Sequence, residues 1–178
     1  MQAPKRGPRI RPLTEQARAA LFNILAARTV DGRFLDLFAG TGAVGIEALS
    51  RGAARAVFVE LDRAAVLAIR QNLASTGFTD RAEIYALDVI RALKILSGQE
   101  AQFDVIFMGA PYDSPALEQA LIMLSETALL KPDGVLIAEH RKQHRLQAEY
   151  KKLKMVRDSR YGETVLSFYE NGSLSGQF

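Results

Sequence analysis

The sequence predicts one doubly wound α/β domain with a mainly parallel sheet. From Arg33 onward, short apolar runs rich in β-branched and aromatic residues alternate with helical stretches, and a glycine-rich turn joins the first run to a helix. At 178 residues the chain has the length of a single domain. Alternation of this kind builds a parallel sheet with helices on both faces. We expect about seven strands, of which the last pair is antiparallel.

The chain begins with a basic segment ahead of the first expected strand. Residues 1–12 are rich in proline, glycine and arginine, which predicts an extended basic arm. Thr14 can cap a helix over residues 15–27, whose apolar face includes Leu21 and Phe22. We expect the folded domain to cover residues 13–170 and a loose tail to cover 171–178.

The remaining elements follow in alternation. Strands are expected at 34–38, 56–60, 82–86, 105–108 and 135–139, and helices at 43–51, 63–76, 89–96 and 115–124. The segment from Lys131 to Gly134 is typical of a turn. Two more strand patterns, at 153–157 and 164–169, are too close together for a helical crossover, so we expect an antiparallel hairpin.

Composition excludes several classes of protein. The chain is 48% hydrophobic and 24% charged, as in globular proteins, and no apolar run approaches the roughly 20 residues that span a bilayer. It has no cysteine with which to build a disulfide framework. We expect a cytoplasmic monomer with no membrane contact and no metal ion.

Basic residues gather in the arm and in a second run from Arg141 to Lys154. A net charge of +3 permits a polyanionic partner without requiring one. A solvated surface is the alternative interpretation of both runs, and the sequence leaves it open. The candidates for phosphate contacts are Arg9, Arg11, Arg141, Lys142 and Lys152.

The glycine-rich turn indicates a ligand at the end of the first strand. Its spacing, Gly40-x-Gly42-x-x-Gly45, also satisfies the dinucleotide-binding pattern, so the glycines alone do not choose a ligand. Asp36 does discriminate, because a carboxylate here would repel a pyrophosphate held at the helix N-terminus. S-adenosylmethionine has no phosphate and carries a sulfonium and an ammonium, which an acid stabilises. The turn and Asp36 therefore favour S-adenosylmethionine.

Two more acids follow later strands. Glu60 ends the second expected strand, where a carboxylate can accept hydrogen bonds from both ribose hydroxyls, although nicotinamide enzymes use the same device. Asp88 follows the third, where it suits the adenine amine or caps the next helix. The predicted cofactor-binding residues are Asp36, Phe38, Gly40, Thr41, Gly42, Glu60, Leu61, Asp88 and Val89.

Four segments together are more specific than the turn: 11–23 (RPLTEQARAALFN), 35–42 (LDLFAGTG), 47–52 (EALSRG) and 58–63 (FVELDR). With Tyr161-Gly162 and the final strand, they make the chain resemble the bacterial family that methylates the exocyclic amine of a guanine in 16S ribosomal RNA. The resemblance implies a Rossmann-like class I methyltransferase fold, S-adenosylmethionine as cofactor, and ribosomal RNA or the small ribosomal subunit as partner. It also implies that Thr14 and Arg18 help to close the site; a helix cap and a surface charge are the alternatives.

The segment from Phe107 to Tyr112 (FMGAPY) stands where the family carries Asp-Pro-Pro followed by Tyr or Phe. In that motif the carboxylate and a carbonyl accept hydrogen bonds from the target amine, and the ring stacks on the base. Here Gly109 has no carboxylate, whereas Ala110 keeps its carbonyl and Pro111-Tyr112 keep the turn and the ring. These four residues are the predicted catalytic set. Because the carboxylate is missing, we expect methyl transfer to be slowed and cofactor binding to be intact.

Three functions remain open on the sequence alone. The first is methylation of a guanine amine in 16S ribosomal RNA. The second is a cofactor-binding RNA or ribosome-assembly protein with weakened catalysis, because of Gly109. The third is a nicotinamide oxidoreductase, against which Asp36 and the lack of a separate substrate domain both argue.

Overall fold

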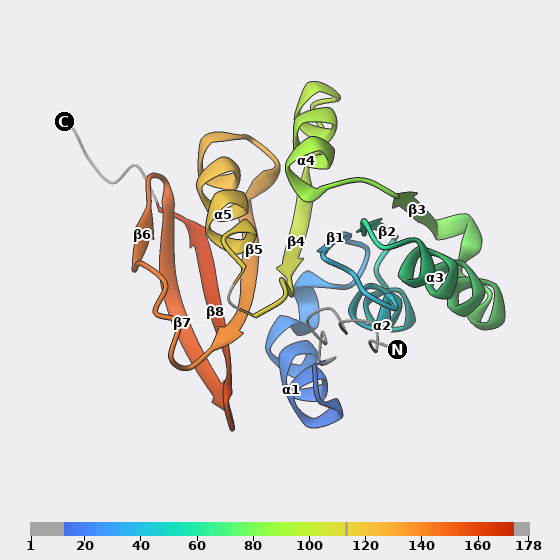
Figure 1. Ribbon diagram of the computed structural model, residues 1–178, viewed down its shortest axis with the longest axis horizontal. Helices are drawn as coiled ribbons and strands as arrows, with labels where there is room; N and C mark the ends of the chain where they lie inside the picture. The colour runs from blue at the N-terminus through green and yellow to red at the C-terminus, as the bar shows by residue number, and fades with distance from the viewer. Residues whose placement is uncertain (1–12, 113, 173–178) are drawn as a thin grey trace, which may run out of the picture.

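The computed structural model describes residues 13–112 and 114–172 and contains one sheet flanked by helices (Figure 1). The expected basic arm, with Arg9 and Arg11, and the end of the expected tail lie outside the described residues. The helices are α1 (Glu15–Leu25), α2 (Ala43–Ser50), α3 (Arg63–Thr76), α4 (Val89–Gly98) and α5 (Ala116–Glu126). The strands are β1 (Arg33–Leu37), β2 (Arg55–Val59), β3 (Ala82–Tyr85), β4 (Phe103–Met108), β5 (Leu130–Arg141), β6 (Glu149–Tyr150), β7 (Leu153–Tyr161) and β8 (Thr164–Asn171).

The sheet has the order β3-β2-β1-β4-β5-β8-β7-β6. The five strands from β3 to β5 are parallel, and β8, β7 and β6 continue the sheet as antiparallel neighbours. The expected hairpin is therefore present, and β8 also pairs with β5. The sheet has eight strands rather than the expected seven, because Glu149 and Tyr150 pair with Lys154 and Leu153. A strand of two residues carries no periodic signal in the sequence.

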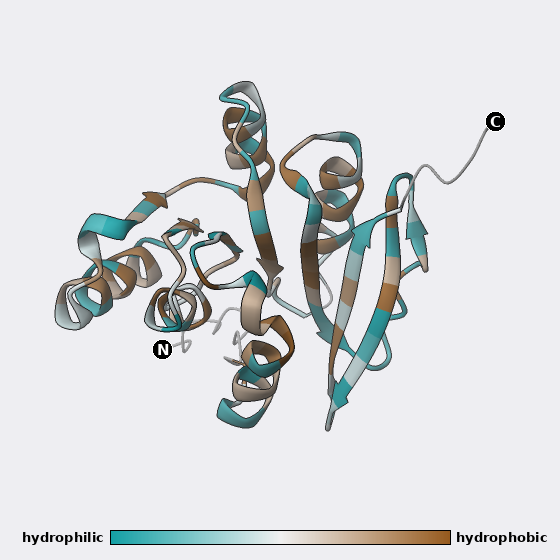
Figure 2. Cartoon of the chain, turned by 180° about the vertical axis from the view of Figure 1, so that it is seen from behind, coloured by the Kyte–Doolittle hydropathy of each residue, from teal (hydrophilic) through white to brown (hydrophobic). Residues whose placement is uncertain are grey.

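Side-chain alternation along the strands divides the core between the two faces of the sheet. Leu35 and Leu37 of β1 pack toward α4 and α5, whereas Phe34 packs toward α1, α2 and α3. Figure 2 shows the hydrophobic character of the central strands and of the helix sides that face them. Asp36 alternates with Leu35 and Leu37, so it points toward α2, on the same face as Phe34.

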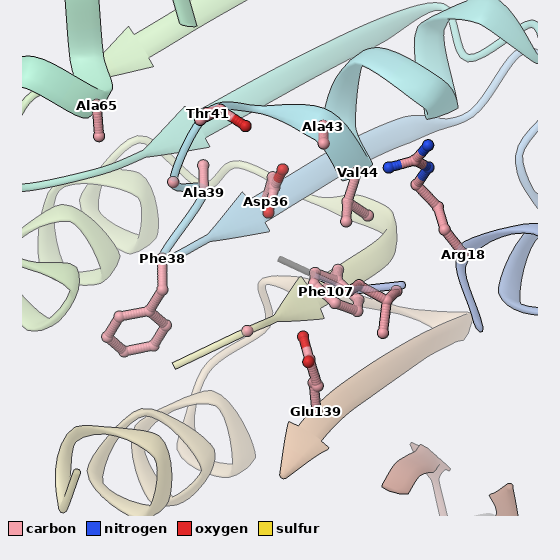
Figure 3. A pocket seen from close by; sticks show the side chains of 13 residues that line it. Arg18, Asp36, Phe38, Ala39, Thr41, Ala43, Val44, Ala65, Phe107 and Glu139 are labelled. Carbon is pink, nitrogen blue, oxygen red and sulfur yellow. The ribbon is translucent and has the colours of Figure 1, made fainter. Parts of the chain in front are cut away.

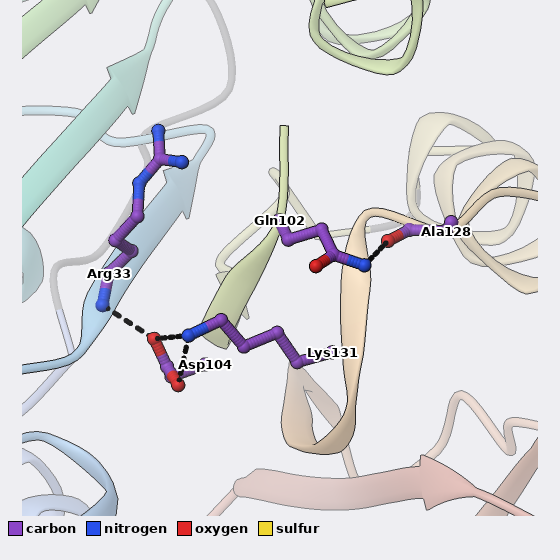
Figure 4. Close-up of polar contacts among 5 residues, drawn as sticks. All are labelled: Arg33, Gln102, Asp104, Ala128 and Lys131. Atoms are coloured by element: carbon purple, nitrogen blue, oxygen red, sulfur yellow. Dashed lines mark hydrogen bonds and ion pairs between the residues drawn. The ribbon is translucent and has the colours of Figure 1, made fainter. Parts of the chain in front are cut away.

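The segment from Lys131 to Gly134, where the sequence predicts a turn, lies inside β5 but interrupts its regular pairing with β4, because Phe103 pairs with Leu130 and Val105 with Val135. Figure 4 shows the contacts that fix this irregular segment to β4: the Lys131 ammonium donates to both oxygens of Asp104, at 2.8 and 2.9 Å. The Arg33 backbone N–H donates to the same carboxylate at 2.8 Å. Asp104 thus ties the beginnings of β1, β4 and β5 together, which fixes their relative position.

Other expected boundaries also differ from the structure; β7, for example, runs to Tyr161 rather than to Arg157. The first helix ends at Leu25 and continues only as a 3-10 turn over Ala26–Arg28, because Ala26 takes a positive φ of 26°. The expected tail begins too early, because β8 runs to Asn171, whose amide donates to the Lys131 carbonyl at 2.8 Å. None of the described helices has the length and apolarity to cross a membrane.

Candidate functional site

The site lies at the carboxyl ends of the parallel strands, where β1 and β4 diverge toward β2 and β5. In doubly wound sheets this reversal of strand order opens a crevice in which ligands bind. Two adjoining cavities are found there, and Phe38 lines both. The inner cavity, about 250 Å³, is bounded by Asp36, Gly40, Gly109 and Glu139, among others. The outer cavity, about 650 Å³, is bounded by Glu60, Leu61, Asp88 and Val89, among others.

The glycine turn gives the inner cavity its shape. Phe38 leaves β1 with a φ of 59°, an unusual conformation for a residue with a side chain, and Gly42 begins α2 with a φ of 80°. Outliers of this kind gather at ligand sites, where the surrounding structure holds them in place. Gly45 has a packing role instead, because an added Cβ would lie 2.3 Å from the Phe58 ring.

Asp36 is a buried carboxylate on the wall of the inner cavity. It is 1% exposed, and its Oδ2 accepts a hydrogen bond of 2.9 Å from the Gly45 backbone N–H. Figure 3 shows its side chain among those that line the cavity. Burial raises the pKa of Asp36 to about 8, and the nearby charges of Glu60 and Glu139 add to the rise. A bound cation would reverse that shift, because an opposite charge favours the ionised form.

Glu60 fixes two turns at once. Its Oε2 accepts the Gly40 N–H at 2.8 Å, and its Oε1 accepts the N–H groups of Leu61 and Asp62 at 2.8 and 2.9 Å. A carboxylate has about four lone-pair positions, so these three bonds leave little capacity for the two ribose hydroxyls that the sequence suggested. Glu60 therefore lies where it was predicted, and it also has a structural role that the sequence did not indicate.

The rest of the outer cavity combines a helix cap with apolar side chains. Asp88 caps α4, because its Oδ1 accepts the N–H groups of Ile90 and Arg91 at 3.0 and 3.2 Å. This is the helix-cap role that the sequence offered as an alternative, and Asp88 also lines the cavity. Leu61 is 65% exposed there, which leaves a large apolar surface available to a flat ring.

Thr14 and Arg18 differ in their positions. The Thr14 hydroxyl accepts the Ala17 N–H at 3.2 Å, so its side chain caps α1, and it is absent from the lining of the inner cavity. Arg18 projects from α1 into that lining (Figure 3). Of this pair, only Arg18 lies where it can close the site.

The predicted catalytic segment follows β4. Gly109 lines the inner cavity, and its N–H donates to the Leu37 carbonyl at 3.2 Å. The Tyr112 hydroxyl contacts Thr164 Oγ1 at 3.2 Å and donates to Glu139 Oε1 at 3.5 Å. The Arg141 guanidinium lies 4.5 Å from the centre of the Tyr112 ring and covers one of its faces.

Glu139 is a member of the site that sequence reasoning missed. It ends an apolar run of β5, is 7% exposed, and directs its carboxylate into the inner cavity (Figure 3). Burial raises its pKa to about 7, and the Tyr112 hydroxyl opposes the rise. The available signal was an acid at the carboxyl end of a parallel strand, the same signal that identified Asp36.

The predicted RNA-contacting residues that the structure describes do not form one surface of free cations. Lys142 pairs with Glu163 at 2.6 Å, and the Lys152 ammonium donates to the Thr127 carbonyl. Arg141, which stacks on Tyr112, is the described member that borders the site. A phosphate held by Arg141 would lie beside the predicted base-stacking ring.

Comparison with known proteins identifies the family. Residues 2–170 match the family model described as Conserved hypothetical protein 95. The chain belongs to this family. It is 36% identical over 164 residues to YlbH of Bacillus subtilis, which carries the name of an rRNA methyltransferase, with 92% of this chain and 89% of that protein covered. It is 29% identical over 163 residues to ribosomal RNA small subunit methyltransferase D of Escherichia coli, with 92% and 80% covered.

Solved structures show the same fold. A hypothetical protein from Thermus thermophilus matches with a TM-score of 0.79 and 35% identity, over 95% of this chain and 93% of that one. The predicted fold, a Rossmann-like class I methyltransferase domain with a mainly parallel sheet and antiparallel strands at its C-terminal end, is confirmed.

Proposed function

We propose that this chain is an S-adenosylmethionine-dependent methyltransferase that modifies the exocyclic amine of a guanine in small-subunit ribosomal RNA. Membership of the family and similarity to rRNA methyltransferases along most of the chain support an rRNA methyltransferase. The guanine amine is the finer part of the proposal, and it rests on the resemblance of the sequence motifs. A ribosomal substrate would place the chain in the cytoplasm.

The observation that carries the proposal is the position of Asp36. It occupies the end of β1 and binds Gly45 N–H in the first turn of α2, the location at which nucleotide-binding proteins hold a phosphate. A pyrophosphate there would find the Gly45 N–H already bound to Asp36 and would further disfavour the ionised form of this buried acid, which argues against a nicotinamide cofactor. A ligand with a cationic end fits, because it would stabilise the ionised form of a group whose pKa is raised to about 8.

The cavities match the two ends of S-adenosylmethionine in chemistry. The inner cavity, with buried Asp36, suits the amino-acid end and the sulfonium, and the outer cavity, with exposed Leu61, suits the adenosine. Both volumes lie within or near the range of about 300–1,000 Å³ found for small-molecule sites. When bound, the cofactor would supply a methyl group carried by a cationic sulfur. The sulfur would keep the electron pair of the sulfur–methyl bond, and the amine nitrogen would form the new bond to the methyl group.

The residues of this chain would bind the cofactor, orient the target base and exclude water from the cavity. Asp36 and the glycine turn hold the cofactor, and Arg18 and Leu13 cover the inner cavity. The Ala110 carbonyl and the Tyr112 ring lie on the substrate side, where they orient the base. Positioning contributes much of the acceleration in such transfers, because it removes the entropy cost of bringing two reactants together.

The test has two arms. Thermal shift with S-adenosylhomocysteine and with NADH compares the two cofactor classes, and we expect only the former to stabilise the protein. Transfer of a labelled methyl group to undermodified small ribosomal subunits, followed by mapping of the modified base, tests the substrate. Cofactor binding without transfer to subunits or to naked rRNA would favour the weakened-catalysis alternative and contradict the proposed activity.

A further inference from the structure

Gly109, which has no side chain in the predicted catalytic segment, lies beside the carboxylate of Glu139 on the neighbouring strand β5. Strands β4 and β5 are parallel, with Phe107 beside Ile137 and Met108 beside Ala138. One residue further along this register, Gly109 is the neighbour of Glu139. Residues in register on parallel strands point to the same face of the sheet.

The distances agree with this register. A Cβ added at Gly109 would lie 3.1 Å from Glu139 Oε2, closer than ordinary van der Waals contact. The same Cβ would lie 3.1 Å from Cε1 of the Phe107 ring. A carboxylate oxygen therefore already lies beside the place where a side chain at 109 would begin.

The surroundings of Glu139 leave its carboxylate available to a ligand. Among the residues that the structure describes, no ion pair engages it, and its hydrogen-bond partner is the Tyr112 hydroxyl at 3.5 Å, at the outer limit for such a bond. Figure 3 shows the carboxylate pointing into the inner cavity, on the same side of the sheet as Asp36. Buried polar groups normally have hydrogen-bond partners, so a buried carboxylate with one long hydrogen bond favours a ligand that donates hydrogen bonds to it.

We propose that Glu139 is a catalytic residue whose carboxylate accepts a hydrogen bond from the target amine, in place of the side chain that Gly109 lacks. This inference rests on the proposed function. Oε2 holds one amine proton, so the nitrogen lone pair points toward the methyl group. The nitrogen becomes positively charged as it is methylated, and it then gives that proton to Oε2, from which the proton passes to water. The carboxylate ends as it began.

The protonation behaviour of Glu139 fits this role. Burial raises its pKa to about 7, so near neutral pH the carboxylate can both accept and release a proton. The charged or titratable groups around it are Asp36 and Arg18 in the inner cavity, Tyr112 after β4, and His140, Arg141 and His144, which line a second, small cavity with it. Asp36 belongs to the cofactor end of the site, and the charge of Glu139 contributes to its raised pKa.

The first experiment separates transfer from binding. We expect Glu139→Gln to lower the rate of methyl transfer about 100-fold or more, the usual size of a lost acid–base group. Its affinity for S-adenosylhomocysteine, measured by calorimetry, should stay near that of the parent. At saturating S-adenosylmethionine, which keeps Asp36 ionised, the parent rate should rise with pH through an inflection near pH 7, and Glu139→Gln should lose that inflection. Glu83→Gln, an exposed acid on β3, is the matched control and should behave as the parent.

The second experiment moves the carboxylate between strands. Gly109→Asp alone should be less active than the parent, because two buried carboxylates at this spacing repel each other. Gly109→Asp in the Glu139→Gln background should recover much of the lost rate, because one carboxylate is again present. Full activity of Glu139→Gln, or no recovery in a folded double variant, would overturn the assignment while leaving the methyltransferase intact.

A third measurement does not depend on turnover and separates this inference from the proposed function. In the unliganded protein, Gly109→Asp should lower Tm more at pH 8 than at pH 5, because repulsion requires both groups to be ionised. Adding Glu139→Gln should remove most of that pH-dependent loss. If the parent methylates no rRNA, both the proposed function and the catalytic role of Glu139 are wrong. The pH dependence of Tm would still show whether position 109 lies beside the Glu139 carboxylate. An equal loss of Tm at both pH values would overturn the juxtaposition itself.

Discussion

The Oδ2 atom of Asp36 accepts a hydrogen bond of 2.9 Å from the backbone N–H of Gly45, and Gly45 in turn packs against the ring of Phe58. The bond joins the end of β1 to the first turn of α2, so the conformation of the glycine turn between them depends on it. Gly45 is needed because the ring leaves no room for a side chain. The Asp36–Gly45 pair therefore links core packing to the shape of the cofactor cavity.

We predict that Gly45→Ala destabilises the protein by about 1–3 kcal/mol, the usual cost of overpacking a core. The added Cβ would lie 2.3 Å from Phe58, which is fully buried and cannot move freely. Urea unfolding measures the change. Gly98→Ala is the control, since its Cβ would meet nothing within 4 Å, and it should change stability by less than about 1 kcal/mol. Equal effects of the two variants would show that the packing is looser than described.

We predict that Asp36→Asn weakens the binding of S-adenosylhomocysteine about tenfold or more, in line with about 1.5–3 kcal/mol for a hydrogen bond to a charged group. The parent should bind more tightly as pH rises from about 6 to about 8, because the free carboxylate has a pKa of about 8 and the ligand's ammonium favours its ionised form. Calorimetry across pH measures both effects. A folded Asp36→Asn protein with unchanged affinity and the same pH dependence would exclude Asp36 from the cofactor site.

The parts of the site that depend on local order could be predicted from the sequence. A strand, a glycine turn and a helix in succession place Asp36 and Gly40 beside one another in any doubly wound sheet. Asp88 was located in the same way, and its capping bonds to Ile90 and Arg91 are local. Such features need only the identity of neighbouring residues.

The features that could not be predicted depend on contacts between distant segments. Glu139 joins the site because β5 pairs with β4 in a register that no local pattern encodes. The segment from Lys131 to Gly134 contains turn-forming residues, and it forms an irregularity inside β5 that the ion pair between Lys131 and Asp104 fixes to β4. Glu60 likewise acquired three backbone partners, one of them 20 residues away.

We predict that Arg141→Ala weakens the binding of ribosomal RNA and reduces the slope of log affinity against log salt by about 1, as expected for one lost phosphate contact. The Tyr112 ring also loses the guanidinium that covers it, so methyl transfer should fall more than binding does. Filter binding over a range of salt concentrations measures the slope. Lys94→Ala, an exposed cation on α4, is the control and should leave the slope unchanged. An unaltered slope for Arg141→Ala would mean that this side chain only supports Tyr112.

We predict that the unliganded protein becomes less stable as pH rises from about 4 to about 8. The pKa of Asp36 is raised from 3.8 to about 8 and that of Glu139 from 4.5 to about 7 on folding. Between these values the folded protein binds more protons than the unfolded chain, so the free energy of unfolding falls with rising pH. The loss should be complete above the folded pKa values, and saturating S-adenosylhomocysteine should reduce it.

The variant that tests this is Asp36→Asn combined with Glu139→Gln, followed by urea unfolding at several pH values. Its free energy of unfolding should vary less with pH than that of the parent, because neither position can then take up a proton. Glu163→Gln is the control: its carboxylate is exposed, and Lys142 and Gln143 lower its pKa, so it contributes with the opposite sign and weakly. A parent and a double variant with the same slope would show that Asp36 and Glu139 stay ionised in the folded protein, and that other groups set its response to pH.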